Sequence, residues 1–190
     1  MASLFKIIAV GLIGVTLGLL VTIYTLERDR RGYKVGPWRS TPHDGTAEID
    51  PYGLASIARA GELPPGATEA VSFEAAADGG GAPLSPNCDY LVTIHTPAAR
   101  YWSLSALTPT GFPVANQAER YAFTSADVLR DQNEPAAILV SARARPGNWL
   151  PVASGKPYIL MLRLYDSSPS AIGTAFDAGS MPSIDKAGCR

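Results

Sequence analysis

The chain has 190 residues, with 16 basic and 17 acidic side chains and a formal net charge of −1. A nucleic-acid-binding surface would show an excess of basic residues, so this balance argues against DNA or RNA as a partner. The 18 glycines and 16 prolines predict many turns, which favours β-structure over a helical bundle.

The chain begins with an apolar segment long enough to cross a membrane. No charged residue occurs from Ile7 to Tyr24, and roughly 18 to 20 such residues span a hydrocarbon core of ~30 Å. A cleaved signal peptide would have a shorter apolar core and a small-residue cleavage site, and the sequence at 22–26 does not resemble one. We therefore expect residues 1–27 to be retained as a transmembrane anchor in the lipid bilayer.

A linker and a short helix are predicted next. Residues 28–50 contain charged residues, Pro and Gly without a periodic apolar pattern, which is typical of a linker. Asp50 suits the N-cap of a helix, and Pro51 suits its first position. The helix is expected to end at Gly61, with its apolar side chains on one face: Leu54, Ile57 and Ala58.

The remainder of the chain, within a domain predicted over 51–190, is rich in strand patterns. The strand-like segments are 69–77, 89–95, 100–108, 136–144 and 157–166. In the last of these, Leu160, Leu162 and Leu164 share a face with Tyr158. Its other face is also partly apolar, which favours a central strand. Turn signals between the segments predict an antiparallel β-sandwich of jelly-roll type. Ser125 is predicted to cap a short helical turn over 126–130.

The two cysteines bear on the compartment of this domain. Cys88 lies where the β-rich core begins, and Cys189 is the penultimate residue. We predict a disulfide between them, which would tie the last segment to the core; the alternative is two free thiols. Disulfides persist in oxidising compartments, so a bond would require export of the domain.

The charges around the apolar segment indicate the opposite orientation. Lys6 precedes the segment, whereas several basic residues follow it: Arg28, Arg30, Arg31, Lys34 and Arg39. By the positive-inside rule, this count places the carboxyl-terminal domain in the cytoplasm. Long domains are translocated largely regardless of such charges, and we expect a periplasmic domain on a single-pass inner-membrane anchor.

Several stretches resemble a known bacterial family. They are VGPWRS, DPYGLASIARAGELP, YWSLSALTPTGF, ERYAFTSADVLR and RARPGNWLPVASGKPYILMLRLYD. They are similar to domain-of-unknown-function family 1214, over roughly residues 35–190. The resemblance implies a jelly-roll sandwich, an exported location and no established activity. Members are commonly fused to a domain of family 1254, which this chain lacks. The resemblance therefore implies a separately encoded companion membrane protein as a partner.

Motifs for catalysis or cofactors are weak. The histidines, His43 and His95, do not combine with the two cysteines at any zinc spacing. There is no G-x-S-x-G elbow and no phosphate-binding loop. Asp127 and Asp131 lie four residues apart, a spacing that is most often a solvated helix face. The sequence therefore predicts no metal, no cofactor and no catalytic residue.

One group of residues is the best candidate for a ligand or partner site. Guanidinium, amide and aromatic groups concentrate in Arg143, Arg145, Asn148, Trp149, Arg163 and Tyr165. They would lie together if the chain returned after Trp149 as a hairpin, and they could then bind a polar ligand. The alternative is structural: Trp149 closes the open end of the core, and Asn148 satisfies loop backbone.

The sequence thus favours a membrane-anchored envelope protein that binds or assembles rather than catalyses. Two alternatives remain. The first is a hydrolase or isomerase acting on an envelope saccharide or lipid. The second is a structural subunit of a larger membrane complex.

Overall fold

A computed structural model describes residues 2–28, 32–41, 44–60, 63–66, 69–95, 99–130, 135–166 and 179–189. The helices in these ranges are α1 (Ala2–Arg28) and α2 (Pro51–Ala60). The strands are β1 (Tyr33–Val35), β2 (Trp38–Ser40), β3 (Ala70–Ala75), β4 (Cys88–Ile94), β5 (Tyr101–Leu107), β6 (Ala122–Thr124), β7 (Ala136–Ser141), β8 (Trp149–Pro151), β9 (Ile159–Tyr165) and β10 (Ser183–Cys189).

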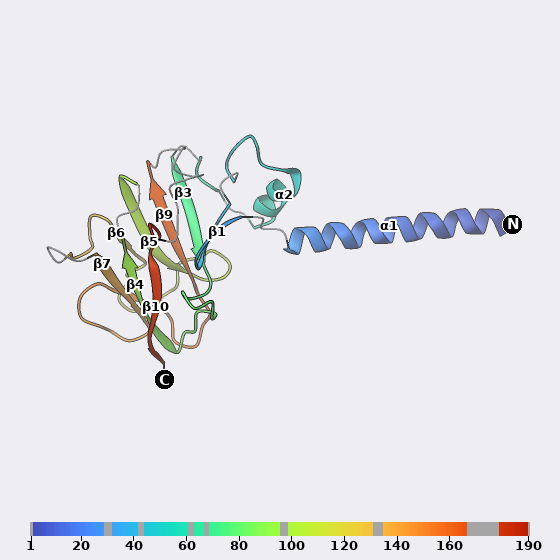
Figure 1. The fold of residues 1–190 in the computed structure, drawn as a ribbon. Coiled ribbons are helices and arrows are strands. Elements are labelled where there is room, and N and C mark those ends of the chain that lie inside the picture. The colour runs from blue at the N-terminus through green and yellow to red at the C-terminus, as the bar shows by residue number, and fades with distance from the viewer. Residues whose placement is uncertain are drawn as a thin grey trace.

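The strands form two sheets that share one hydrophobic core (Figure 1). One sheet has six strands in the order β1-β2-β3-β9-β5-β6, and the other has four in the order β10-β4-β7-β8. The pairs are antiparallel, except that β7 and β8 are parallel. The predicted mainly β, two-sheet fold is confirmed, and this arrangement is consistent with the jelly-roll type.

Strand β9 lies at the centre of the larger sheet, as its two apolar faces predicted. It pairs with β3 on one side and with β5 on the other. Leu160, Leu162 and Leu164 are fully buried, whereas Arg163 between them is exposed. Because successive side chains of a strand point to opposite faces, the leucines pack on the second sheet and Arg163 faces outward.

The structure corrects the linker that was predicted over 28–50. Residues 33–40 form the β1–β2 hairpin, with Gly36 at a positive φ of 57° in its turn, and β2 pairs with β3. Trp38 is 0% exposed, and its indole N–H donates a 2.7 Å hydrogen bond to the carbonyl of Pro182. Strands of three residues are too short to show an alternating pattern, which explains the error.

Helix α2 begins as predicted but is oriented differently. The Asp50 carboxylate accepts hydrogen bonds from the backbone N–H groups of Tyr52 and Gly53, at 2.9 and 3.1 Å. This satisfies two of the free donors at the helix start. The predicted apolar face does not pack on the sandwich, because Leu54 is 57% exposed.

The turn predicted over 126–130 begins earlier, at 125–127, and its cap is Thr124 rather than Ser125. The segment is a turn in which the carbonyl of Thr124 accepts from the N–H of Val128 at 3.2 Å. The Thr124 hydroxyl hydrogen-bonds the Asp127 carboxylate at 2.5 Å. The cap is therefore one residue earlier than expected, and Asp127 is used within the turn.

Helix α1 projects away from the sandwich (Figure 1). Its segment Ser3–Thr25 has a mean hydropathy of 2.4 over its best window and none of that window is buried. By length and composition it is able to cross a membrane, a property that an export signal sequence shares.

The predicted disulfide between Cys88 and Cys189 is present. It joins directly opposed residues of β4 and β10, which are 101 residues apart in the sequence. Strand β10 is an edge strand, and its residues from Asp185 onward are exposed. Few apolar contacts therefore hold the end of the chain, and the covalent bond fixes it to the sheet.

Removal of this bond should lower the stability of the domain. A Cys88→Ser/Cys189→Ser double variant loses the closure of a loop of about 100 residues, for which a chain-entropy model gives an upper value of roughly 4 to 5 kcal/mol. The free energy of unfolding, measured with denaturant, should decrease by an amount up to this upper value. Addition of a reductant should bring the wild type to the same value and leave the variant unchanged. Equal stabilities without reductant would contradict the expectation.

Candidate functional site

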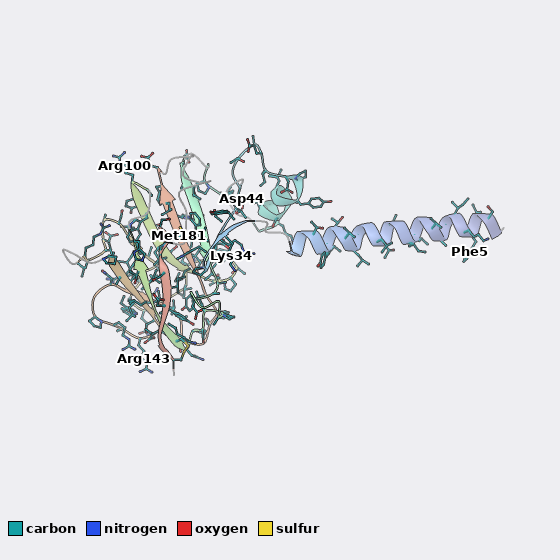
Figure 2. The ribbon with its side chains drawn as sticks, in the orientation of Figure 1. Phe5, Lys34, Asp44, Arg100, Arg143 and Met181 are labelled. Atoms are coloured by element: carbon teal, nitrogen blue, oxygen red, sulfur yellow. A yellow bond between two sulfur atoms is a disulfide. The ribbon has the colours of Figure 1, made fainter. Side chains whose placement is uncertain are left out.

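The six residues of the predicted site do not gather in one place. Strand β8, which contains Trp149, belongs to the four-stranded sheet, whereas β9, which contains Arg163 and Tyr165, lies in the six-stranded sheet. The hairpin that would have joined them is therefore absent. Figure 2 shows Arg143 and Arg100, the residue before β5, at opposite ends of the sandwich. The site divides into two separate groups.

The first group includes Asn148 and Trp149, which are bonded to backbone. The Asn148 amide donates to the carbonyls of Leu129 and Ala137, at 2.8 and 3.0 Å, and accepts from the N–H of Leu129 at 2.8 Å. The half-buried Trp149 donates its indole N–H to the carbonyl of Ser141 at 2.9 Å. These contacts match the structural alternative, in which both side chains hold loops in place.

One arginine of the first group pairs with an acidic side chain. Arg145 forms an ion pair with Asp89, which also accepts a 2.6 Å hydrogen bond from the hydroxyl of Ser141. Ser141 is fully buried. Arg143 is exposed in the loop after β7. The Asp89 carboxylate is thus engaged by partners from β7 and the loop after it.

Tyr158 is buried close to this acidic residue. Its hydroxyl has no hydrogen-bond partner among the described residues. Burial raises the pKa of Tyr158 well above its usual value, and the nearby Tyr90 and Asp89 raise it further. A phenol in this environment stays protonated, so it is unsuited to act as a base.

The second group lies on the outward side of the six-stranded sheet, which we call the β9 face. Cross-strand neighbours there are Tyr101 and Tyr165, whose ring centroids are 5.6 Å apart. In the next row, Arg163 lies between Ser72 and Ser103. We define the β9 face by these five residues.

The Arg163 side chain is exposed and makes no hydrogen bond or ion pair with any residue that the structure describes. A free guanidinium offers five donors in a planar fork. Tyrosine rings beside it add apolar area with a polar end. The β9 face can therefore hold an acidic or polar group of a partner without rearrangement of the sheet.

Sequence reasoning missed three of the five residues of the β9 face. The alternation within 69–77 and 100–108 does put Ser72, Tyr101 and Ser103 on the outward side of their strands. It does not reveal that these strands flank β9, because neighbours in a sheet come from distant parts of the chain. The alternation in the sequence therefore indicated which side chains point outward on each strand, but it did not indicate which strands are paired.

The histidines and the pair of Asp127 and Asp131 were not predicted to form a site. Within the described ranges there is no group of three or more His, Cys, Asp or Glu side chains that could hold a metal ion. His95 is exposed after β4. His43 and Asp131 lie outside the described residues.

Substitution of Trp149 and Arg163 should separate the two groups. We expect Trp149→Ala to lower the free energy of unfolding by roughly 2 to 4 kcal/mol, because it removes a large packed side chain and its hydrogen bond. Arg163→Ala should change it by about 0.5 kcal/mol or less, as for other surface sites. Denaturant unfolding measures both. A large loss on changing Arg163 would mean that the outward side of β9 is not a free surface.

Tyr158→Phe should leave the stability at neutral pH unchanged or higher, because it removes a buried hydroxyl without a partner. Above a pH of about 10, an unfolded tyrosine loses its proton. Folded Tyr158, with its raised pKa, keeps the proton. The wild type should therefore lose stability as the pH rises above that value, and the variant should lose less.

Denaturant unfolding near neutral pH and in the alkaline range tests this difference. Tyr101→Phe, at an exposed tyrosine, is the control and should follow the wild type. A strong loss of stability for Tyr158→Phe at neutral pH would show that the hydroxyl has a partner.

Comparison with known proteins supports the resemblance seen in the sequence. A family model described as "Protein of unknown function (DUF1214)" matches residues 69–169, just over half of the chain. No curated protein matches the chain.

Two solved structures are similar. The VPA0106 protein from Vibrio parahaemolyticus has a TM-score of 0.61 and 20% identity, over 93% of this chain and 44% of that chain. An uncharacterised protein from Burkholderia cenocepacia has a TM-score of 0.47 and 13% identity, over 89% of this chain and 40% of that chain. This chain thus spans less than half the length of either protein.

The first of these likenesses shows a shared fold, and the family match covers the segment from the start of β3 through β9. That segment contains the outward-facing residues of the β9 face and the buried leucines behind them. On this evidence, the chain belongs to the DUF1214 family of proteins of unknown function.

Proposed function

We propose that this protein is a non-catalytic binding or assembly module of the bacterial cell envelope. In this proposal α1 anchors it in the inner membrane, and the sandwich lies in the periplasm. The observation that carries the binding role is the β9 face, where an exposed arginine without a partner among the described residues lies between two serines and beside a tyrosine pair.

The disulfide supports the periplasmic location. The Cys88–Cys189 bond ties an exposed edge strand to the sheet, and such bonds form and persist in oxidising compartments. An apolar helix at the start of the chain provides a route of export. The basic residues after this helix favour the opposite orientation, but a long domain is translocated in spite of such charges.

The chemistry of the β9 face favours a protein partner with an acidic or polar contact surface. Arginine and tyrosine are enriched among the residues that contribute most to protein interfaces. The face is centred on a strand that is paired on both sides, so binding would require little ordering of the backbone. Arg100, at the same end of the sheet, forms an ion pair with Asp166 at 3.6 Å. Its charge is thus already compensated, whereas the charge of Arg163 is available to a partner.

We propose that the partner of the β9 face is a separately encoded companion membrane protein, as the family resemblance in the sequence implies.

Site-specific photocrosslinking in intact cells tests the proposal. A photoreactive phenylalanine analogue replaces Tyr101 of the β9 face in one variant and Arg143, in the loop after β7, in a control. Both positions are exposed, and Arg163 stays in place in both variants. We expect a discrete crosslinked product in the membrane fraction from position 101 and none from position 143. Mass spectrometry should identify the same partner in repeated preparations.

Equal crosslinking from both positions, or none from position 101, would show that the β9 face is not the binding surface. A reporter enzyme that is active only outside the cytoplasm, fused after Arg190, locates the sandwich in the same cells. Activity of a cytoplasm-only reporter at that position would contradict the periplasmic location.

A further inference from the structure

Helix α2 exposes apolar side chains, which a helix on a folded domain usually buries. Tyr52 is 47% exposed and Leu54 is 57% exposed. Ala55 and Ala58 are exposed beside them, and Arg59 is the only charged residue on this exposed side. The half-buried residues are Gly53, Ser56 and Ile57. Of these, Ile57 alone has a large apolar side chain. The helix thus presents mostly apolar side chains to its surroundings.

The segment just after α2 has the same character. Leu63 is 95% exposed. Exposed apolar side chains do not stabilise a folded domain in water. Patches of such side chains usually mark an interaction surface. The surface formed by Tyr52, Leu54, Ala55 and Ala58 of this helix is called here the α2 surface.

The connections of the chain place the α2 surface close to the end of α1. Five Cα steps separate Arg28 from Tyr33, which span at most about 18 Å. The β1–β2 hairpin then brings the chain back, because Tyr33 lies opposite Ser40. The excursion that contains α2 leaves the sheet at this point and returns to β3, the neighbour of β2.

The contacts agree with this placement. Helix α2 contacts α1 and lies beside the carboxyl-terminal end of α1 (Figure 1). Gly45, at a positive φ of 78°, packs so closely on the carbonyl of Pro65 that a Cβ atom would meet it at 2.5 Å. The two ends of the excursion are therefore held together, which restricts the positions that α2 can take.

We propose that the α2 surface lies in the interface of the lipid bilayer and forms a second membrane contact of the sandwich. This inference rests on the proposed retention of α1 as an anchor. A bilayer that covers Ser3–Thr25 would end next to α2. The lipid that surrounds α1 would therefore extend to the α2 surface.

The composition of α2 fits that depth. Interfacial helices bury a small apolar face at the boundary between headgroups and acyl chains. Tyrosine is enriched at this boundary because its ring is apolar and its hydroxyl is polar. Arg59, in the last turn of α2, is able to extend its charged group toward the headgroups while its methylene chain stays in the apolar layer.

Lipid quenching of a tryptophan in the full chain tests this inference. Leu54→Trp places an indole on the α2 surface, at a site exposed enough to accept it. Leu129→Trp is the matched control, because Leu129 is 70% exposed and follows β6, on the side of the sandwich away from α1 (Figure 1). The wild type, with 3 tryptophans, gives the background emission.

Each protein is reconstituted into phosphatidylcholine vesicles, with and without bromine on the upper acyl carbons. Flotation of the vesicles reports whether α1 anchors the chain. We expect all three proteins to float. The added emission of Leu54→Trp should shift to shorter wavelength and be lost in brominated lipid, whereas that of Leu129→Trp should be unchanged.

Flotation without quenching of Leu54→Trp would overturn the α2 contact and leave the anchor standing. That result would be expected if a protein partner, rather than lipid, covered α2. Failure to float would overturn the anchor and the α2 contact together. Equal quenching at both positions would overturn the inference as well, because it would show that the whole sandwich meets the lipid without selection of α2.

Discussion

The burial of one face of β9 is the interaction on which the other features depend. Leu160, Leu162 and Leu164 have no exposed surface, and each buried leucine contributes roughly 1.5 to 3 kcal/mol relative to exposure. The strand pairs along its length on both sides. It therefore fixes the positions of β3 and β5, and the second sheet packs on the leucines. The alternation of the backbone then directs Arg163 and Tyr165 outward.

The two ends of the domain are joined to this core by different means. At the start, Trp38 is buried and its indole N–H binds the carbonyl of Pro182, just before β10. At the end, Cys189 is bonded to Cys88. The hairpin that follows α1 is thus connected to the strand that ends the chain.

These features give the sandwich two surfaces with different chemistry. The α2 surface is apolar and lies beside α1, whereas the β9 face combines a guanidinium, serine hydroxyls and tyrosine rings. In the proposed membrane location of α1, the apolar surface beside it would be stabilised by lipid, and a polar aromatic face is suited to a selective contact with a protein. Contact of α2 with the membrane would restrict the rotation of the sandwich and so present the β9 face in a limited range of directions.

Local patterns in the sequence were sufficient to predict individual helices and strands. The uncharged run of α1, the Asp50 cap of α2 and the alternation in β4, β5 and β9 each have a signature within a few neighbouring residues. The leucine face of β9 follows from period-two spacing alone. The cysteine pair was identified from position and compartment, although free thiols remained an alternative until the opposed strands β4 and β10 were known.

Only the tertiary structure decided which elements lie together. A strand pattern defines two faces but does not name the neighbours, because pairing joins segments that are far apart in the chain. For this reason Trp149 and Arg163 were predicted in one site and lie in different sheets. The β1–β2 hairpin was missed because its strands are short, and Trp38 gains its role only from contact with Pro182. The outward orientation of α2 likewise depends on where the hairpin returns the chain, which no local pattern of residues records.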